Sequence, residues 1–251
     1  MPTLSELSPE QRTTLTQLKR ETSQYQANDA VLRELRNRSV EVISESGPVA
    51  VGKTALTTIV TNENPAIATI GTSTNRTHKA SDPENFTTDI PLELLIDDIR
   101  TRNVVNYAVI EETGAVYVTY PSGLSAPYNI GPIAADNVNV LLNNIGSERY
   151  QPVYIISPLA SWKQNIDESL GERPDTITQR MYESRDSLEF ADRNKDVFRF
   201  VINERGEDAK KHASQTIGAI ALRQQFEPAA EKDVQLILQE MIAHTDRYIV
   251  H

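Results

Sequence analysis

A short glycine-bounded motif sets the strongest limit on how this chain can fold. Residues 47–54 read Gly-Pro-Val-Ala-Val-Gly-Lys-Thr and match the pattern G-x-x-x-x-G-K-[ST]. The two glycines allow a tight backbone path that turns successive N–H groups toward an anion, and a helix that follows adds its positive N-terminal end. Residues 40–44 alternate and are β-branched, which predicts a strand before the motif. The pattern predicts a strand, a phosphate-binding loop and a helix; the alternative is a glycine turn with an exposed lysine.

The residues of this loop have distinct expected roles at a nucleotide site. Lys53 is expected to reach the β- and γ-phosphates, and the hydroxyl of Thr54 is expected to ligate Mg²⁺. The rest of the loop contributes mainly backbone to the nucleotide site, at Gly47, Pro48, Val49, Ala50, Val51 and Gly52.

The composition excludes several other kinds of site. The chain has no Cys, which rules out disulfides, Cys-bound zinc, iron–sulfur clusters and thiol nucleophiles. Its four His residues form no HExxH or HxH pair, so a His-rich metal site is not expected. Asp and Glu number 35 against 25 Lys and Arg, which argues against a chain whose whole surface binds nucleic acid but allows a local basic groove for phosphates. No apolar run suits a membrane helix and the N-terminus does not resemble a secretion signal, so we expect a cytoplasmic protein without a membrane partner.

Predicted strands and helices alternate along the chain. Such alternation predicts an α/β fold with three layers and a mostly parallel sheet, and Thr113-Gly114 indicates one antiparallel hairpin. The predicted strands are residues 40–44, 66–70, 104–111, 115–120, 138–142, 153–157 and 197–203. The predicted helices are residues 8–38 (in two parts), 55–60, 91–102, 160–192, 208–220 and 229–249.

Four segments follow the loop in an order that is similar to one known family. They are Thr-Ser-Thr-Asn-Arg at residues 72–76, Gly-Ala-Val-Tyr-Val-Thr at 114–119, Arg-Pro-Asp-Thr-Ile-Thr-Gln-Arg-Met at 173–181 and Phe-Val-Ile-Asn-Glu at 200–204. Together with the loop, this order resembles the guanylate kinase family of nucleoside monophosphate kinases over roughly residues 40–220.

The resemblance implies ATP-dependent phosphoryl transfer, with Mg²⁺, to a phosphorylated small-molecule acceptor, of which GMP is the first candidate. In the family pattern Lys53, Arg173 and Arg180 would neutralise charge on the transferring phosphoryl group. Asn203 would lie near the ATP base. The acceptor site would comprise Thr72, Arg76, Lys79, Tyr117 and Thr119.

The resemblance also implies a domain organisation. Residues 39–222 would form the kinase-like domain, with an acceptor-binding insertion at about 72–125 and a helical lid at about 160–190. Residues 1–38 would be a helical N-terminal extension lying on a core or a partner. Residues 223–251 would form a C-terminal helix, and a homodimer through the terminal helices is one expectation.

The chain departs from the family pattern in the acceptor region. Asn106 stands closest to the position where the family has a Glu that reads guanine, and residues 141–144 read Leu-Leu-Asn-Asn in place of a strand ending in Asp-x-Asp. Val116 and Val118 replace a Tyr and a Gly, and residues 81–86 contain no Tyr. The acceptor therefore stays open, and a sugar phosphate is an alternative, because ribose bisphosphate kinases are similar to this family.

Other interpretations also stay open. The chain can be a nucleotide-binding regulatory or scaffold protein on the same fold, with weak or no kinase activity. A tRNA dimethylallyltransferase has a similar loop, but residues 69–76 lack the Asp-Ser-x-Gln segment of that family. The cations Arg76, Lys79, Arg173 and Arg180 have an alternative interpretation as solvated surface charges.

Overall fold

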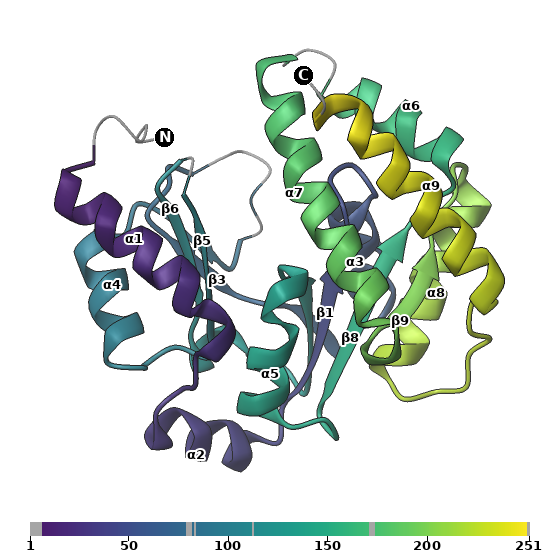
Figure 1. Cartoon of the computed structure of the whole chain (residues 1–251). Helices are drawn as coiled ribbons and strands as arrows, with labels where there is room; N and C mark the ends of the chain where they lie inside the picture. Colours follow the sequence, from purple (N-terminus) through teal and green to yellow (C-terminus); the bar gives the residue numbers. More distant parts are fainter. Residues whose placement is uncertain (1–6, 79–81, 83, 112, 171–173, 250–251) are drawn as a thin grey trace. The chain divides into compact units, whose positions relative to one another are not determined.

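The computed structural model describes residues 7–78, 82, 84–111, 113–170 and 174–249. The chain forms two compact units, each assembled from separate stretches of sequence (Figure 1). Unit 1 comprises Met1–Val42, Ala68–Asn129 and Asn137–Tyr150. Unit 2 comprises Ile43–Ile67, Ile130–Asp136 and Gln151–His251.

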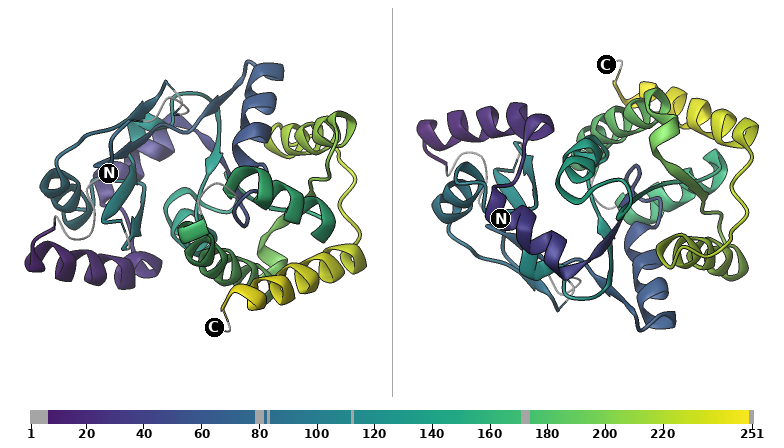
Figure 2. Two further views of the ribbon diagram at one scale, coloured as in Figure 1. Left: turned by 90° about the horizontal axis from the view of Figure 1, so that it is seen from above. Right: turned by 90° about the horizontal axis from the view of Figure 1, so that it is seen from below.

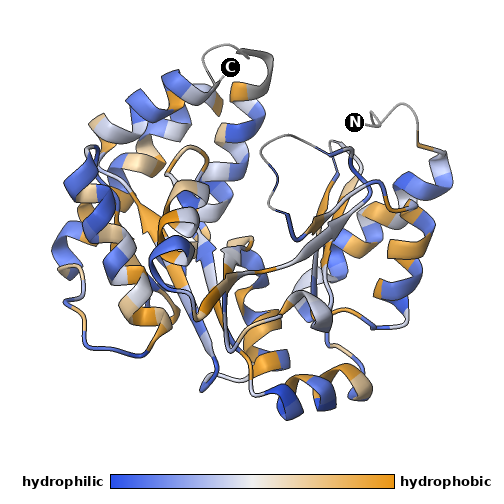
Figure 3. Ribbon diagram, turned by 180° about the vertical axis from the view of Figure 1, so that it is seen from behind, coloured by the Kyte–Doolittle hydropathy of each residue, from blue (hydrophilic) through white to orange (hydrophobic). Residues whose placement is uncertain are grey.

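A five-stranded sheet, most of it in unit 2, has the strand order β2-β7-β1-β8-β9. Strands β8 and β9 are parallel, with Val153 opposite Arg199. The middle strand β1 is buried from its second residue onward, and Figure 3 shows apolar colour concentrated on the strands. The strands are β2 (Ile67–Thr69), β7 (Tyr128–Pro132), β1 (Glu41–Ser46), β8 (Tyr150–Ile156) and β9 (Arg199–Ile202).

Helices of unit 2 pack against one another as well as on the sheet. Helix α3 contacts α8, and α9 runs alongside α7 and also contacts α6 (Figures 1 and 2). The last helix has a buried apolar face, formed by Val234, Ile237, Leu238 and Met241. No helix within the described ranges has both the length and the apolar character needed to cross a bilayer. The helices are α3 (Lys53–Glu63), α6 (Leu159–Leu170), α7 (Pro174–Arg193), α8 (Glu207–Ala221) and α9 (Glu231–Ile249).

Unit 1 contains a four-stranded sheet with the order β4-β3-β6-β5. Strands β5 and β6 are antiparallel on either side of Thr113-Gly114, so the predicted hairpin is confirmed. Helix α4 (Leu92–Arg100) contacts β6, and helix α2 (Asp29–Arg38) contacts α5 (Val138–Ile145). The strands are β3 (Thr72–Thr74), β4 (Phe86–Thr87), β5 (Asn106–Ile110) and β6 (Ala115–Thr119).

The predicted N-terminal helices belong to the core of unit 1. Helix α1 (Pro9–Glu21) begins with a capping box, in which the Ser8 side chain accepts a hydrogen bond from the backbone N–H of Gln11 at 3.1 Å. The Tyr107 hydroxyl from β5 donates to the carbonyl oxygen of Leu18 at 2.8 Å, and Leu18 itself is buried. These contacts tie α1 directly to the hairpin.

One predicted strand is wrong. Residues 138–142 lie in helix α5, whose residues 138, 141 and 145 are buried at helical spacing, and a short apolar run alone does not separate a buried strand from a helix. The proposed correspondence of residues 141–144 with a strand end is therefore also wrong. Asn144 instead lies in α5 and donates to the carbonyl oxygen of Val105 at 2.8 Å. Strand β1 lies between β7 and β8, and β7 was not predicted because Gly131 and Pro132 disfavour a strand assignment.

Candidate functional site

The glycine-bounded motif lies between β1 and α3, as its pattern predicts. Three of its residues have positive φ: Gly47 (148°), Ala50 (59°) and Gly52 (96°). A Cβ on Gly47 would lie 2.5 Å from the carbonyl oxygen of Ile155, and one on Gly52 would lie 2.5 Å from the Asn203 amide nitrogen. Both glycines are therefore required by the backbone path and by close neighbours.

The loop surrounds a cavity of about 460 Å³ in unit 2. Three residues of α7, namely Arg180, Glu183 and Ser184, complete its lining. Arg180 donates to the Glu183 carboxylate at 2.9 Å and remains half-exposed. The structure thus brings together these predicted site residues: Gly47, Pro48, Val49, Ala50, Val51, Gly52, Lys53, Thr54 and Arg180.

Side chains from three distant segments bind the backbone of the loop. The indole nitrogen of Trp162 donates to the carbonyl oxygen of Val49 at 2.7 Å, and the Val49 N–H donates to the Ser184 hydroxyl at 3.1 Å. The Asn203 amide donates to the carbonyl oxygen of Val51 at 2.8 Å. Asn203, predicted near the ATP base, is buried and holds the loop. Sequence reasoning did not assign Trp162 or Ser184 to the site, because no local pattern links them to the loop.

The Lys53 ammonium is bound by its own loop. It donates to the carbonyl oxygens of Gly47 and Pro48, each at 2.7 Å. Burial lowers the pKa of Lys53 to about 8, although the nearby Glu45 carboxylate acts in the opposite direction. The side chain therefore stays largely protonated at neutral pH. Its acceptors are uncharged carbonyl groups, which the anionic oxygens of a phosphate can replace.

Glu45 is a buried acid directly behind the loop. It lies on β1, has no exposed surface, and accepts a hydrogen bond from the Thr57 hydroxyl of α3. Its second carboxyl oxygen has no hydrogen-bond partner among the described residues. Burial raises the pKa of Glu45 to about 7, and the hydrogen bond from Thr57 and the charge of Lys53 both lower it. Sequence reasoning missed Glu45, which follows the predicted strand at residues 40–44 directly and precedes the loop.

Of the predicted acceptor residues, Arg76 and Tyr117 lie together in unit 1. The Arg76 guanidinium carbon lies 4.8 Å from the centre of the Phe86 ring and 5.9 Å from that of Tyr117. Thr72 pairs with Phe86 across β3 and β4, and Thr119 pairs with Asn106 across β6 and β5. Two further predicted residues, Lys79 and Arg173, lie outside the described residues.

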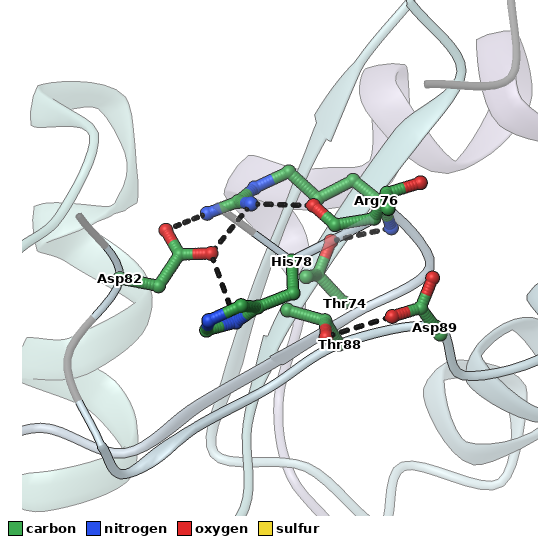
Figure 4. A network of polar contacts seen from close by, with 7 residues as sticks. Thr74, Arg76, His78, Asp82, Thr88 and Asp89 are labelled. Carbon is green, nitrogen blue, oxygen red and sulfur yellow. Dashed lines mark hydrogen bonds and ion pairs between the residues drawn. The ribbon is translucent and has the colours of Figure 1, made fainter. Parts of the chain in front are cut away.

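Arg76 is already paired with an acid of its own unit. Figure 4 shows the Asp82 carboxylate facing the guanidinium, with contacts of 2.5 and 2.8 Å to its two terminal nitrogens. Both side chains are only 7% exposed, and His78 Nδ1 lies 3.6 Å from the same carboxylate. The hydrogen bonds that Arg76 donates to the Asp82 carboxylate raise the pKa of Arg76. The sequence did not reveal this partner, which changes how readily Arg76 can bind a phosphate.

The loop offers oxygen ligands for Mg²⁺ but no preformed metal cage. No group of three or more His, Cys, Asp or Glu side chains converges within the described part of the chain. Thr54 and Glu183 line the same cavity, and Mg²⁺ in proteins takes oxygen ligands, commonly from one or two side chains together with substrate phosphates. These residues fit a Mg²⁺ ion that arrives with a nucleotide.

Comparisons with known proteins leave the family of the chain open. No protein-family model matches it, and no curated protein matches it. Among solved structures, it is similar to guanylate kinase from Anaplasma phagocytophilum, with a TM-score of 0.48 and 12% sequence identity, over 74% of this chain and 87% of that one. A likeness of this degree carries no functional argument, so the function has to be argued from the residues themselves.

Proposed function

We propose that this chain binds ATP with Mg²⁺ at residues 47–54 and transfers the γ-phosphoryl group to a phosphorylated small molecule. The observation that carries this proposal is the cavity around which the loop, Lys53 and Arg180 gather. The start of α3 contributes unpaired N–H groups and a positive helix end, which favour phosphate oxygens. The residue types and the cavity together suit a polyphosphate.

Within this proposal the chain's own groups have separate roles. Lys53 leaves the carbonyl oxygens of Gly47 and Pro48 and binds the phosphate oxygens of the donor. Arg180, half-exposed at the cavity, adds positive charge where the transition state spreads negative charge. Thr54 would supply a hydroxyl ligand to Mg²⁺, which would offset the negative charge of the donor phosphates.

A nucleoside monophosphate is our first candidate for the acceptor. Tyr117 and Thr119 of β6 and Thr72 of β3 supply hydroxyl groups in unit 1, and Asn106 is buried opposite Thr119. The Asn106 amide oxygen has no hydrogen-bond partner among the described residues, so it can accept from a ligand. Because an amide is neutral, we expect weaker selection for guanine than a carboxylate gives, and a ribose phosphate is the alternative acceptor.

The pairing of Arg76 with Asp82 favours a second candidate function. A phosphate at Arg76 has to displace a buried carboxylate that makes two hydrogen bonds to the same guanidinium. If that exchange is too costly, the chain binds a nucleotide at its loop without transferring the phosphoryl group. It would then be a nucleotide-binding regulatory or scaffold protein.

The test is ATP consumption by the purified chain with Mg²⁺ against a panel of nucleoside monophosphates and ribose phosphates. A preferred acceptor, with consumption lost in Lys53→Met, supports the kinase. ATP binding that depends on Lys53, without turnover on any acceptor, supports the second candidate. Absence of ATP binding by the wild-type chain contradicts both functions.

A further inference from the structure

Glu45, the buried acid that precedes the loop, has no role in the proposed phosphoryl transfer. Glu45 lies on β1, two residues before Gly47, and its side chain is completely buried. Its hydrogen bond from Thr57 ties it to α3, the helix that Lys53 begins. A carboxylate in such a place is costly to bury, since one of its oxygens has no hydrogen-bond partner among the described residues.

Lys53 is the group that offsets this cost. Among the described residues, the Lys53 ammonium is the charged group that acts on the Glu45 carboxyl, and Arg180 from α7 acts in turn on Lys53. Lys53 nevertheless donates its hydrogen bonds to Gly47 and Pro48 rather than to Glu45. The acid and the lysine therefore interact through charge, and the ammonium is free to exchange its carbonyl partners.

We infer that Glu45 is a positioning residue of the phosphate loop: its buried carboxylate is an internal counter-charge to Lys53 and lowers the affinity of the loop for polyphosphates. This inference rests on the proposed function, because it needs the loop to bind phosphates. It adds a determinant of affinity that lies under the loop, outside the residues that line the cavity.

The physical reason is competition for one positive charge. When a polyphosphate binds, Lys53 turns to the new anion, and Glu45 keeps its own charge beside several added negative ones. Like charges repel appreciably in the interior of a protein, where water screens them little. The polyphosphate then either binds more weakly, or its binding is accompanied by the uptake of a proton from solvent by the Glu45 carboxyl. Both consequences disappear if the carboxyl is replaced by an uncharged group of the same shape.

The experiment compares wild type and Glu45→Gln in binding inorganic pyrophosphate, measured by calorimetry without Mg²⁺ at pH 6 and pH 8. At pH 8 we expect the variant to bind about threefold more tightly, because the lost repulsion outweighs the fall in the pKa of Lys53 that removal of the Glu45 charge also causes. At pH 6 the two should agree within about twofold, since the pKa of Glu45, about 7, leaves the acid mostly neutral there. The ratio between the two proteins at each pH removes the titration of pyrophosphate itself.

A matched control separates this local effect from a change in net charge. Glu63→Gln removes the same charge from an exposed position at the far end of α3. We expect its pyrophosphate affinity to stay within about twofold of wild type at both pH values. An equal effect in both variants would overturn the inference.

A second variant keeps the inference testable if Glu45→Gln does not fold. In Thr57→Val the acid keeps its charge but loses a hydrogen bond that lowers its pKa. Pyrophosphate binding should therefore weaken at a higher pH in Thr57→Val than in wild type, and an unchanged pH profile contradicts the inference.

The outcomes distinguish this inference from the proposed function. If wild type binds pyrophosphate, Lys53→Ala does not, and Glu45→Gln equals wild type at pH 8, the inference is wrong and the phosphate site stands. If wild type binds no pyrophosphate at either pH, both are wrong. Tighter binding by Glu45→Gln at pH 8 alone, with Glu63→Gln unchanged, supports the inference.

Discussion

Lys53 and Arg76 are both predicted to bind phosphate, and the structure gives them different partners. Lys53 donates to two backbone carbonyl oxygens of its own loop, whereas Arg76 makes two hydrogen bonds to the Asp82 carboxylate. A carbonyl group has no net charge, so a phosphate replaces it at little electrostatic cost. A phosphate at Arg76 must displace an anion that is already bound in good geometry.

The difference shows that the ability of a cation in a motif to bind a phosphate depends on the partner that the cation already has. In unit 2 the acid near Lys53 is held by Thr57 and leaves the ammonium free to change partners. In unit 1 the acid is bonded directly to the arginine. The first arrangement favours ligand binding, and the second favours the folded state of the segment that carries it.

The largest expected effect is on phosphoryl transfer and comes from removing Lys53. Lys53→Ala should reduce phosphoryl transfer by about 10³-fold, because the donor phosphates lose their principal side-chain cation. Steady-state turnover with the preferred acceptor measures this. Lys211→Ala, an exposed lysine of α8, serves as the control and should keep wild-type turnover. Equal turnover in Lys53→Ala and wild type would show that the loop takes no part in transfer.

Removing Arg76, whose charge the Asp82 carboxylate neutralises, should mainly lower the free energy of unfolding. Arg76→Ala leaves the Asp82 carboxylate buried without its guanidinium, which we expect to lower the free energy of unfolding by about 3 kcal/mol. Denaturant unfolding followed by circular dichroism measures the change. Arg33→Ala, at an exposed position of α2, should cost less than about 0.5 kcal/mol. A similar small cost for Arg76→Ala would mean that the pair does not hold unit 1.

The buried acid of unit 2 should make stability depend on pH. The pKa of Glu45 is raised from 4.5 to about 7 in the folded chain, so the folded state binds the proton more tightly than the unfolded state. The Glu45 carboxyl therefore contributes to the free energy of unfolding below pH 4.5. This contribution is lost as the pH rises through 7, and the free energy of unfolding falls by about 2 to 3 kcal/mol. Denaturant unfolding of wild type and Glu45→Gln between pH 5 and pH 8 measures it. A parallel pH dependence in the two proteins contradicts this assignment.

The smallest effect tests how firmly the loop is held. Trp162→Phe keeps a ring in the core but removes the hydrogen bond to the carbonyl oxygen of Val49. We expect a cost of about 1 kcal/mol, seen as roughly fivefold weaker ATP binding in calorimetry. Unchanged ATP affinity, with the variant folded, would show that this bond does not shape the site.

The strand, loop and helix around residues 47–54 were predicted from a pattern that is local in sequence. The loop motif occupies residues 47–54, and its glycines, lysine and threonine can be identified without knowing what surrounds them. The signal for the hairpin at Thr113-Gly114 is equally local. The wrong strand at residues 138–142 marks the limit of such patterns, because a short apolar run suits a buried helix and a buried strand alike.

Residue spacing along the chain was thus enough to predict a strand, a glycine-bounded loop and a helix. Such a prediction is possible because backbone geometry and residue preference act over a few neighbouring residues. The partners of each charged group depended on the tertiary structure. Asn203 reaches the loop from 152 positions along the chain, and the Asp82 carboxylate binds Arg76 although no sequence motif links the two residues. Burial and electrostatic pairing depend on which groups meet in the folded chain, and that is why the structure alone separates the available cation from the neutralised one.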